Sequence, residues 1–479
     1  MISFLVAIIC LIVGFLFYGK VAESVFGPDV NRETPAYADR DDVDYLPMPT
    51  WKTYLVQLLN IAGTGPIFGA LSGALFGPIV YFWIVLGCIF GGAVHDYFCG
   101  MISVRSKGAS VSELVNTNLG PAMGNVMRVF SVILLVMCGV VFTVGPAGLL
   151  NIITPDRFDT TFWLAVVMIY YFIATFLPID KIIGKIYPLF GACLIIMALG
   201  VGGVMFFNPN FNMPEIFDNF KNMHAQNLPV WPFMFITVAC GAVSGFHATQ
   251  SPIMARCLKN EKDGKKVFYG AMISEGIIAM VWAAAGVTCY ESSQALLAAG
   301  AGTSAVVYEV CMKTMGAFGG IIAMLGVIAC PISSGDTAYR SARLTIADWF
   351  KIDQSKYKNR IIITIILLGA GFIISKQDYN IVWRYFSWSN QTLAMIVLWM
   401  ETVYLFNNKK NYLITLVPAV FMTAVTTTYF MVAKECMGFF FGLANVDSKL
   451  NYTIGVVTGV AFAIILLAVF NNYKNKRKI

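Results

Sequence analysis

Long apolar segments recur along the whole chain, and this pattern constrains its fold more than any other feature. Runs of about 20 apolar residues are long enough to cross the hydrocarbon core of a bilayer as helices. Only 12% of the residues are charged, whereas a soluble domain carries about a quarter. The sequence therefore predicts an all-α polytopic membrane protein.

Apolar windows predict about 13 transmembrane helices. They lie approximately at residues 1–18, 54–77, 79–104, 123–150, 160–177, 184–206, 231–256, 267–289, 318–346, 360–375, 380–405, 412–433 and 453–472. The first window has no preceding basic residues and no small-residue cleavage site before Lys20. We therefore expect a retained first helix rather than a signal peptide.

The distribution of positive charge predicts an orientation. If the basic tail "KNKRK" is cytoplasmic, all but seven of the 33 Lys and Arg residues fall on the cytoplasmic side. The seven are Arg157, Lys221, Lys313, Lys376, Arg384, Lys434 and Lys449. This bias follows the positive-inside rule and places the N-terminus outside and the C-terminus in the cytoplasm. It also accounts for the net charge of +7 without a nucleic-acid partner.

The sequence contains none of the common motifs of disulfide-rich domains, zinc sites or soluble enzymes. The 11 cysteines are scattered without a CxxC pair, which favours small packing residues over a disulfide framework or a zinc knuckle. His95 and Cys99 are one helical turn apart, but two ligands do not make a metal site. There is no P-loop, HExxH or GxSxG motif. We expect no enzyme, no metal and no other cofactor.

Two predicted helices contain glycine and proline at mid-depth. The first is "LLNIAGTGPIFGA", residues 58–70, and the second is "ACGAVSGFHATQSPIMARC", residues 239–257. Unpaired backbone in hydrocarbon is tolerated only inside protein or beside a wet cavity. The glycines could also serve close helix packing alone. Two such breaks favour a binding site for something polar.

The spacing of the two breaks predicts internal symmetry. They fall in the second and seventh predicted helices, which cross the membrane in opposite directions. This arrangement is typical of two inverted five-helix repeats whose broken first helices meet at the midplane. We therefore expect repeats at 54–206 and 207–405, preceded by a helix and cytoplasmic loop at 1–53. Two further helices and a basic tail follow at 406–479.

The chain resembles the carbon starvation protein A family of bacterial inner-membrane transporters. The resemblance rests on "FGPDVNRETPA", "PMPTWK", "QLLNIAGTGPIFGA", "GCIFGGAVHDY", "GFHATQSPIMARC", "CPISSGDTAYRSARL" and "RYFSWSNQTLA". It implies uptake of peptides or pyruvate during carbon limitation, and a fold related to the leucine-transporter type. Substrate choice differs within the family, so the substrate stays open between these two.

We expect the substrate to bind at the breaks, where helix ends offer dipoles and free backbone groups. His247, Gln250 and Ser251 share one helical face after the second break. The candidate substrate-binding residues are Asn60, Gly63, Thr64, Gly65, Gly241, Ser244, Gly245, His247, Gln250 and Ser251.

Ionisable and hydroxyl groups inside the predicted helices are candidates for ion coupling. They are His95, Asp96, Glu275, Ser333, Ser334, Asp336 and Thr337. In the leucine-transporter arrangement the Ser333–Thr337 segment faces the first break, where oxygen ligands would suit Na⁺. A protonatable His or carboxylate would suit H⁺. Each group also has a structural alternative, such as an i, i+4 ion pair between Asp336 and Arg340.

Two further segments, residues 383–391 and the loop at 290–317, have predicted structural roles. Trp383, Tyr385 and Trp388 favour packing or interfacial positions, while Asn390 and Gln391 extend a possible cavity wall. The external loop at 290–317 can hold a short amphipathic helix over the outer vestibule.

The expected function is a secondary transporter that works by alternating access in the bacterial cytoplasmic membrane. It is driven by H⁺ or Na⁺, because nothing indicates ATP coupling. An ion channel or a non-transporting nutrient sensor is the alternative. The bilayer and a small solute are the expected partners, and the oligomeric state is open.

Overall fold

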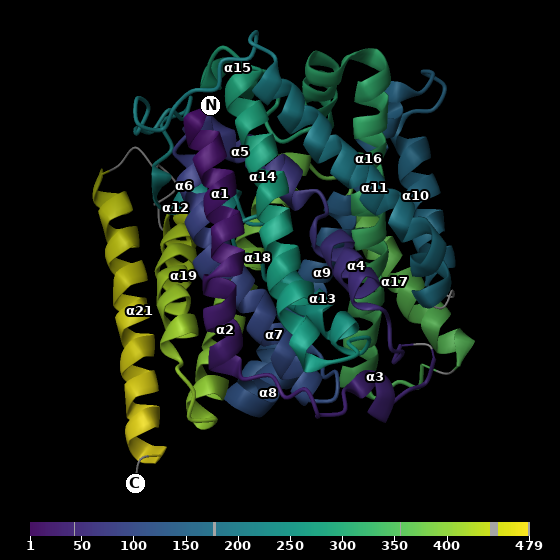
Figure 1. Ribbon diagram of the computed structural model, residues 1–479, viewed down its shortest axis with the longest axis vertical. Helices are drawn as coiled ribbons and strands as arrows, with labels where there is room; N and C mark the ends of the chain where they lie inside the picture. The colour runs from purple at the N-terminus through teal and green to yellow at the C-terminus, as the bar shows by residue number, and fades with distance from the viewer. Residues whose placement is uncertain (43, 176–178, 355, 441–448, 478–479) are drawn as a thin grey trace.

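The computed structural model describes residues 1–479 except 43, 176–178, 355, 441–448 and 478–479. Residues 478–479, at the end of the basic tail, therefore lie outside the described part. Within that part the chain is all-helical, with no β-strand. Most of the long helices run along one common axis, which is vertical in Figure 1. The predicted all-α class is confirmed.

Apolar periodicity interrupted by Gly and Pro produces both long and short helices. The α-helices are α1 (Ile2–Leu16), α2 (Tyr18–Phe26), α3 (Pro35–Ala38), α4 (Thr50–Ile61), α5 (Ala70–Gly73), α6 (Val80–Leu86), α7 (Ala93–Arg105), α8 (Val111–Leu119), α9 (Pro121–Ile153), α10 (Thr160–Ala174), α11 (Ile179–Phe207), α12 (Val230–Thr237), α13 (Phe246–Ala255), α14 (Gly270–Thr288), α15 (Ser293–Ala298), α16 (Ser304–Phe350), α17 (Tyr357–Ile374), α18 (Tyr379–Asn407), α19 (Leu413–Val432), α20 (Met437–Phe440) and α21 (Lys449–Arg477). The π- and 3₁₀-helical turns are η1 (Gly65–Gly69), η2 (Ala74–Phe76), η3 (Gly87–Gly92), η4 (Glu261–Asp263) and η5 (Lys265–Tyr269).

The number of membrane-crossing helices differs from the prediction. Nine helices in the described ranges are long and apolar enough to cross a bilayer, and the bent pair Thr50–Ile61 and Gly65–Phe76 makes a tenth. The predicted count of 13 is therefore not confirmed. The helix α10 has only 15 residues, and α12 and α13 are short pieces of 8 and 10 residues. The helix α18 is long, but Asn390, Gln391 and Glu401 interrupt its apolar sequence.

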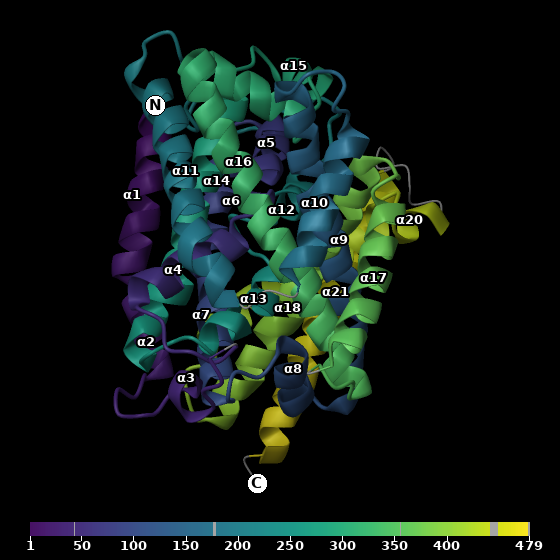
Figure 2. The same ribbon diagram turned by 90° about the vertical axis from the view of Figure 1, so that its right-hand side faces the viewer.

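The helices pack into one bundle. The helix α16 packs against α9 and α11, while α19 lies between α18 and α21. On another side, α1 packs on α14, and Figure 2 shows this part of the bundle at its edge. The start of α1 and the end of α21 lie at opposite ends of the bundle (Figure 1).

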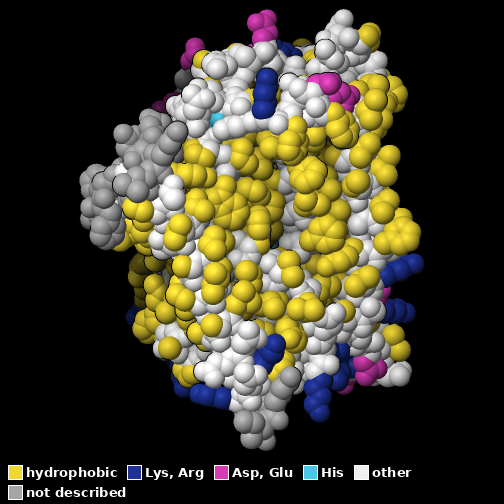
Figure 3. Space-filling view, turned by 90° about the vertical axis from the view of Figure 1, so that its left-hand side faces the viewer, with side chains coloured by type: hydrophobic (Ala, Val, Ile, Leu, Met, Phe, Trp, Pro, Cys, Tyr) yellow, Lys and Arg dark blue, Asp and Glu magenta, His cyan; other side chains and the backbone are white. Residues whose placement is uncertain are grey.

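The surface of the bundle is suited to lipid. Figure 3 shows a broad hydrophobic band between two rims, with Lys and Arg side chains gathered toward the lower rim. Large apolar side chains such as Phe82, Phe90 and Val417 are exposed in this structure. In water such exposure would be costly, whereas in a bilayer it is the normal condition of a transmembrane helix. The protein is therefore membrane-embedded.

The external loop predicted at 290–317 contains α15 and the first turns of α16. The backbone of α16 bends sharply at Gly316, whose φ is +68°. The segment before this bend is therefore set apart from the long remainder of α16.

Candidate functional site

The first break separates α4 from η1. The helix α4 ends at Ile61, and a π-helical turn begins at Gly65 after three non-helical residues. Two carbonyl groups freed by the break receive hydrogen bonds from α16. The Cys330 thiol donates to the carbonyl oxygen of Ala62 at 2.7 Å, and the Ser334 hydroxyl donates to that of Leu59 at 2.9 Å. The facing helix thus satisfies the broken backbone, as buried polar groups require.

The second break separates α12 from α13. Residues 238–245 are non-helical, and Gly241 adopts a φ of +89°, a conformation that glycine takes at little cost. The side-chain oxygen of Asn390 in α18 accepts the Phe246 N–H at 2.7 Å. The backbone oxygen of Asn390 accepts the Gly245 N–H at 3.1 Å. Its neighbour Gln391 donates to the carbonyl oxygen of Phe235 at 3.0 Å. Adjacent residues of α18 therefore cap both halves of this broken helix.

The two breaks lie against each other. A Cβ atom built on Gly65 would lie 2.3 Å from the Cβ of Cys240, and one built on Gly241 would lie 3.9 Å from the Cα of Pro66. Two segments about 175 residues apart in sequence are thus in contact at their interruptions, as the sequence predicted. The third predicted helix also approaches this point, because a Cβ on Gly92 would lie 2.3 Å from the carbonyl oxygen of Ala242.

Four ionisable side chains form a chain beside the second break. The Asp96 carboxylate contacts the Nδ1 atoms of His95 and His247, each at 2.8 Å. The other ring nitrogen of His247, Nε2, lies 3.2 Å from the Glu275 carboxylate. All four side chains are fully buried, with 0% exposed surface. Buried charges are retained where they pair or bind an ion, so this cluster, named the His–carboxylate cluster below, is a candidate ion site.

Several candidate substrate-binding residues carry polar atoms without a hydrogen bond. Asn60 has no partner for either amide atom among the described residues, and the same holds for the Thr64 hydroxyl and the Gln250 side-chain oxygen. Gln57, one turn before Asn60, also has no hydrogen-bond partner for either side-chain amide atom among the described residues. Unsatisfied buried groups are rare in folded proteins and indicate a missing partner. A bound solute is one such partner.

Other predicted substrate residues have internal roles. Ser244 accepts a hydrogen bond from the side-chain amide of Asn390 at 3.1 Å. The Ser251 hydroxyl donates to the carbonyl oxygen of His247, within α13. Gly63 packs on the ring of Phe142, because a Cβ atom built on this glycine would lie 2.7 Å from that ring.

The predicted coupling residues of α16 form their contacts outside the His–carboxylate cluster. Ser333 and Thr337 donate within α16, to the carbonyl oxygens of Cys330 and Ser334. Asp336 lies 3.9 Å from Arg340, so the predicted i, i+4 contact is present. Its other oxygen, Oδ1, has no hydrogen bond in the described part of the chain.

Two important residues, Cys240 and Glu401, were missed at the sequence level, and a third, Asn390, was given a different role. Cys240 lies at the second break, and its Sγ lies with donor atoms of His247 and Glu275 in a group whose members are all within 4.8 Å of one another. Asn390 was expected only in a cavity wall. Glu401 is a fully buried carboxylate of α18, and the signal for it was available, since it is an ionisable residue in a long hydrophobic helix.

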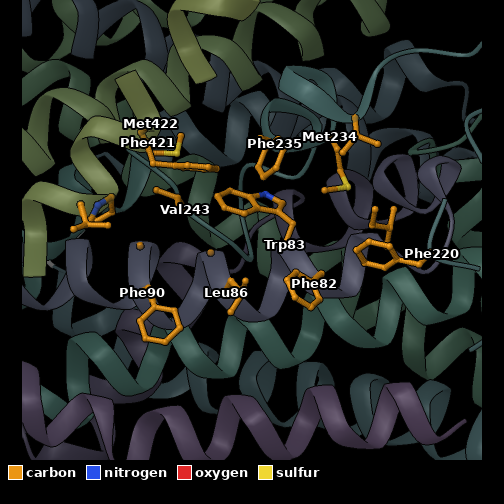
Figure 4. Close-up of a pocket in the computed structure, with 16 residues that line it drawn as sticks. Phe82, Trp83, Leu86, Phe90, Phe220, Met234, Phe235, Val243, Phe421 and Met422 are labelled. Atoms are coloured by element: carbon orange, nitrogen blue, oxygen red, sulfur yellow. The ribbon is translucent and has the colours of Figure 1, made fainter. Parts of the chain in front are cut away.

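An apolar cavity lies behind the second break. Its volume is about 390 Å³, and its lining includes Trp83, Val243 and Phe421. Figure 4 shows these side chains around it, together with Phe82 and Phe90 from the lipid-exposed surface. The described residues that line this cavity include no charged side chain, so it is distinct from the polar site. Trp83 links the two, because its indole N–H donates to the carbonyl oxygen of Val238 in the break at 3.1 Å.

Comparison with solved structures shows a shared fold. A manganese transporter of Eremococcus coleocola superposes with a TM-score of 0.62 at 9% identity, covering 91% of this chain and 99% of that one. A histidine-to-alanine mutant of the same transporter gives a TM-score of 0.60 at 11% identity, with the same coverage. At this identity the likeness concerns the fold alone.

Comparison with known sequences identifies relatives. A Haemophilus influenzae protein described as an uncharacterized membrane protein is 42% identical, and the match covers 62% of this chain and 93% of that protein. The Bacillus subtilis peptide transporter CstA is 30% identical over 59% of this chain and 58% of its own length. The Escherichia coli pyruvate/proton symporter BtsT is 26% identical over 56% and 46%. The chain thus spans about half the length of these two transporters.

The family model described as carbon starvation protein CstA matches residues 1–151, 151–299 and 287–429. The matched region contains both breaks, the His–carboxylate cluster and the capping residues of α16 and α18. The chain therefore belongs to the CstA carbon starvation protein family.

Proposed function

We propose that this protein is a secondary active transporter that takes up peptides or pyruvate-like small carboxylates by ion-coupled alternating access. The observation that carries the proposal is the contact between the two broken helices beside a fully buried His–carboxylate cluster. Broken backbone and buried charge are both costly in a bilayer. Their coincidence at one point favours a site where a polar solute and an ion bind together.

In this proposal the solute binds at the two breaks, beside their point of contact. Its binding residues are Asn60, Gly63, Thr64, Gly65, Gly241, Ser244, Gly245, His247, Gln250 and Ser251. The unpartnered amide and hydroxyl atoms of Asn60, Thr64 and Gln250 support this assignment. They offer both donors and acceptors, which suits a peptide bond or a carboxylate.

The proposed coupling ion is H⁺ or Na⁺, and two groups of residues are candidates to bind it. One is the His–carboxylate cluster, with His95, Asp96 and Glu275. The other is Ser333, Ser334, Asp336 and Thr337 of α16, which contacts the first break through Ser334. The name of the Escherichia coli relative, a pyruvate/proton symporter, favours H⁺.

The proposed architecture is two inverted five-helix repeats, at 54–206 and 207–405, with additional helices at 1–53 and 406–479. Support comes from the two breaks, one in the first membrane helix of each proposed repeat. We also propose that the N-terminus is outside and the C-terminus is cytoplasmic, in the bacterial cytoplasmic membrane. The opposite positions of the ends of α1 and α21 in Figure 1 fit an odd number of crossings.

Relatives favour transport over the other functions. Two of them are named as a peptide transporter and a pyruvate/proton symporter. An ion channel would need a continuous pore, and a nutrient sensor would bind the solute without moving it. An enzyme would need a nucleophile–base pair or a comparable catalytic group, and the proposal assigns no such role to any residue.

The test is uptake by the purified protein in proteoliposomes. Labelled pyruvate and a labelled dipeptide are compared under an imposed H⁺ gradient, an imposed Na⁺ gradient and no gradient. We expect saturable accumulation of one substrate class under one gradient. Non-saturable flux would indicate a channel, and binding without accumulation would indicate a sensor.

A further inference from the structure

Three side chains with different donor atoms converge at the second break. Cys240 belongs to the non-helical segment, His247 to α13 and Glu275 to α14. One ligand atom from each lies within 4.8 Å of the other two. In a tetrahedral zinc site the donor atoms are about 3.3–3.8 Å apart, because the bonds measure about 2.0–2.3 Å. Metal binding requires the three donors to approach one another to that spacing.

The nitrogen and oxygen donor atoms that face this point have no partner in the described part of the chain beyond their contact with each other. His247 Nε2 and both carboxylate oxygens of Glu275 lack a hydrogen-bond partner among the residues described, although Nε2 and Oε2 are only 3.2 Å apart. Both side chains are fully buried. Burying such groups with a single 3.2 Å contact between them carries a desolvation cost. A cation between them removes this cost.

Hydrogen bonds from neighbouring residues orient the donor groups of His247 and Cys240. The other ring nitrogen of His247, Nδ1, contacts the Asp96 carboxylate at 2.8 Å, and His95 contacts the second oxygen of Asp96. A histidine that binds a metal usually donates its remaining N–H to a carboxylate in this way. On the cysteine side, the Asn390 amide donates to Cys240 Sγ at 3.7 Å, a contact that stabilises a thiolate.

We propose that Cys240, His247 and Glu275 bind one divalent transition-metal ion of the zinc class. A thiolate, an imidazole and a carboxylate are typical ligands of Zn²⁺. The charges of the thiolate and the carboxylate balance those of the ion, which suits a buried site. The three ligands leave a fourth position for water or a substrate oxygen.

This ion would connect the second break to α13 and α14. It would also occupy two residues of the proposed solute and coupling sites, His247 and Glu275. The inference therefore goes beyond the proposed function, and binding can be measured without any transport.

The experiment uses the full-length protein, purified in detergent without an affinity tag and stripped with a chelator. The chain contains 3 histidines and 11 cysteines, so a cysteine-to-alanine control is needed to separate this site from other thiols. Bound Zn²⁺ is quantified per chain, and Co²⁺ is used as a spectroscopic substitute whose thiolate charge-transfer band reports a cysteine ligand. The variants are Cys240→Ala and Glu275→Gln. The matched control is Cys311→Ala, which removes another buried thiol on α16.

We expect one tightly bound Zn²⁺ per chain and a thiolate band for the wild type and for Cys311→Ala. Cys240→Ala should lose the band, and both ligand variants should bind more weakly by at least the ~10–100-fold that loss of an orienting partner causes. The loss of Zn²⁺ affinity in Asp96→Asn should fall within that range. Size-exclusion profiles and thermal unfolding without metal identify any misfolded variant. Absence of binding by the wild type, or equal binding by folded Cys240→Ala, would overturn the proposal.

Discussion

Gly65 and Cys240 touch across the two broken helices, with no space for a side chain on the glycine. A Cβ on Gly65 would overlap both the Cβ and the Sγ of Cys240, at 2.3 Å each. Such an approach lies far inside normal van der Waals contact. The distance between the two breaks therefore depends on this glycine.

Gly65→Leu is expected to abolish transport while the protein still inserts in the membrane. The leucine would push the two breaks apart. The measurement is uptake in proteoliposomes at matched protein levels. Gly369→Leu is the control, because a Cβ there meets nothing within 4 Å. Normal uptake kinetics from Gly65→Leu would mean that the contact is only a packing feature.

Local sequence was enough to locate both breaks, because clustered Gly and Pro lower the helix propensity of a segment. A single proline is not sufficient, since Pro146 lies inside α9 and Pro331 inside α16. The i, i+4 contact between Asp336 and Arg340 was equally local. The partners of the breaks were not local. Asn390 lies almost 150 residues from the N–H groups that it caps, and no pattern within α18 specifies that pairing.

The His–carboxylate cluster shows the same limit. The sequence predicted buried roles for His95, Asp96, His247 and Glu275, because ionisable groups in apolar helices are few. Which of them touch depends on how α7, α13 and α14 are rotated about their axes, since a helical side chain changes direction by about 100° per residue. Cys240 was overlooked because a single cysteine among many carries no spacing signal.

Asn390→Ala is expected to destabilise the second break. It leaves the buried N–H of Phe246 without its acceptor, at a cost of about 1–3 kcal/mol in the free energy of unfolding. Asn390→Asp keeps an acceptor oxygen and should recover part of the loss. Thermal unfolding in detergent measures both.

The control for this pair is Asn408→Ala, since Asn408 is an exposed residue just after α18. If Asn390→Ala unfolds at the same temperature as that control, the cap does not contribute to stability.

His224 predicts a dependence of stability on pH. It lies in the loop before α12, and burial lowers the pKa of its imidazole to about 4, below the ordinary value of about 6.5. Between these values the unfolded chain binds a proton that the folded protein does not. The stability contribution is therefore complete above about pH 6.5 and is lost as the pH falls toward 4.

The Nδ1 atom of His224 accepts the N–H of Gln226 at 3.2 Å, a role that the neutral ring can fill. We expect the melting temperature of the wild type to fall more between pH 7 and pH 5 than that of His224→Gln, measured in the same detergent. Identical decreases in the two proteins would exclude His224 as the source.

Asp336 provides the test of ion coupling on α16. Its Oδ1 has no hydrogen bond among the described residues, and it lies one turn from Ser333 on the helix that caps the first break. If Asp336 binds the driving ion, Asp336→Asn should remove accumulation against a gradient but spare exchange between equal compartments, which needs no net ion release. Arg340 has another partner, the carbonyl oxygen of Ala174 at 2.8 Å, so the single change does not leave the guanidinium isolated. If the double variant Asp336→Asn with Arg340→Gln recovers accumulation, Asp336 serves the ion pair instead. If Asp336→Asn alone accumulates substrate fully, His95, Asp96 and Glu275 remain as the candidates for coupling.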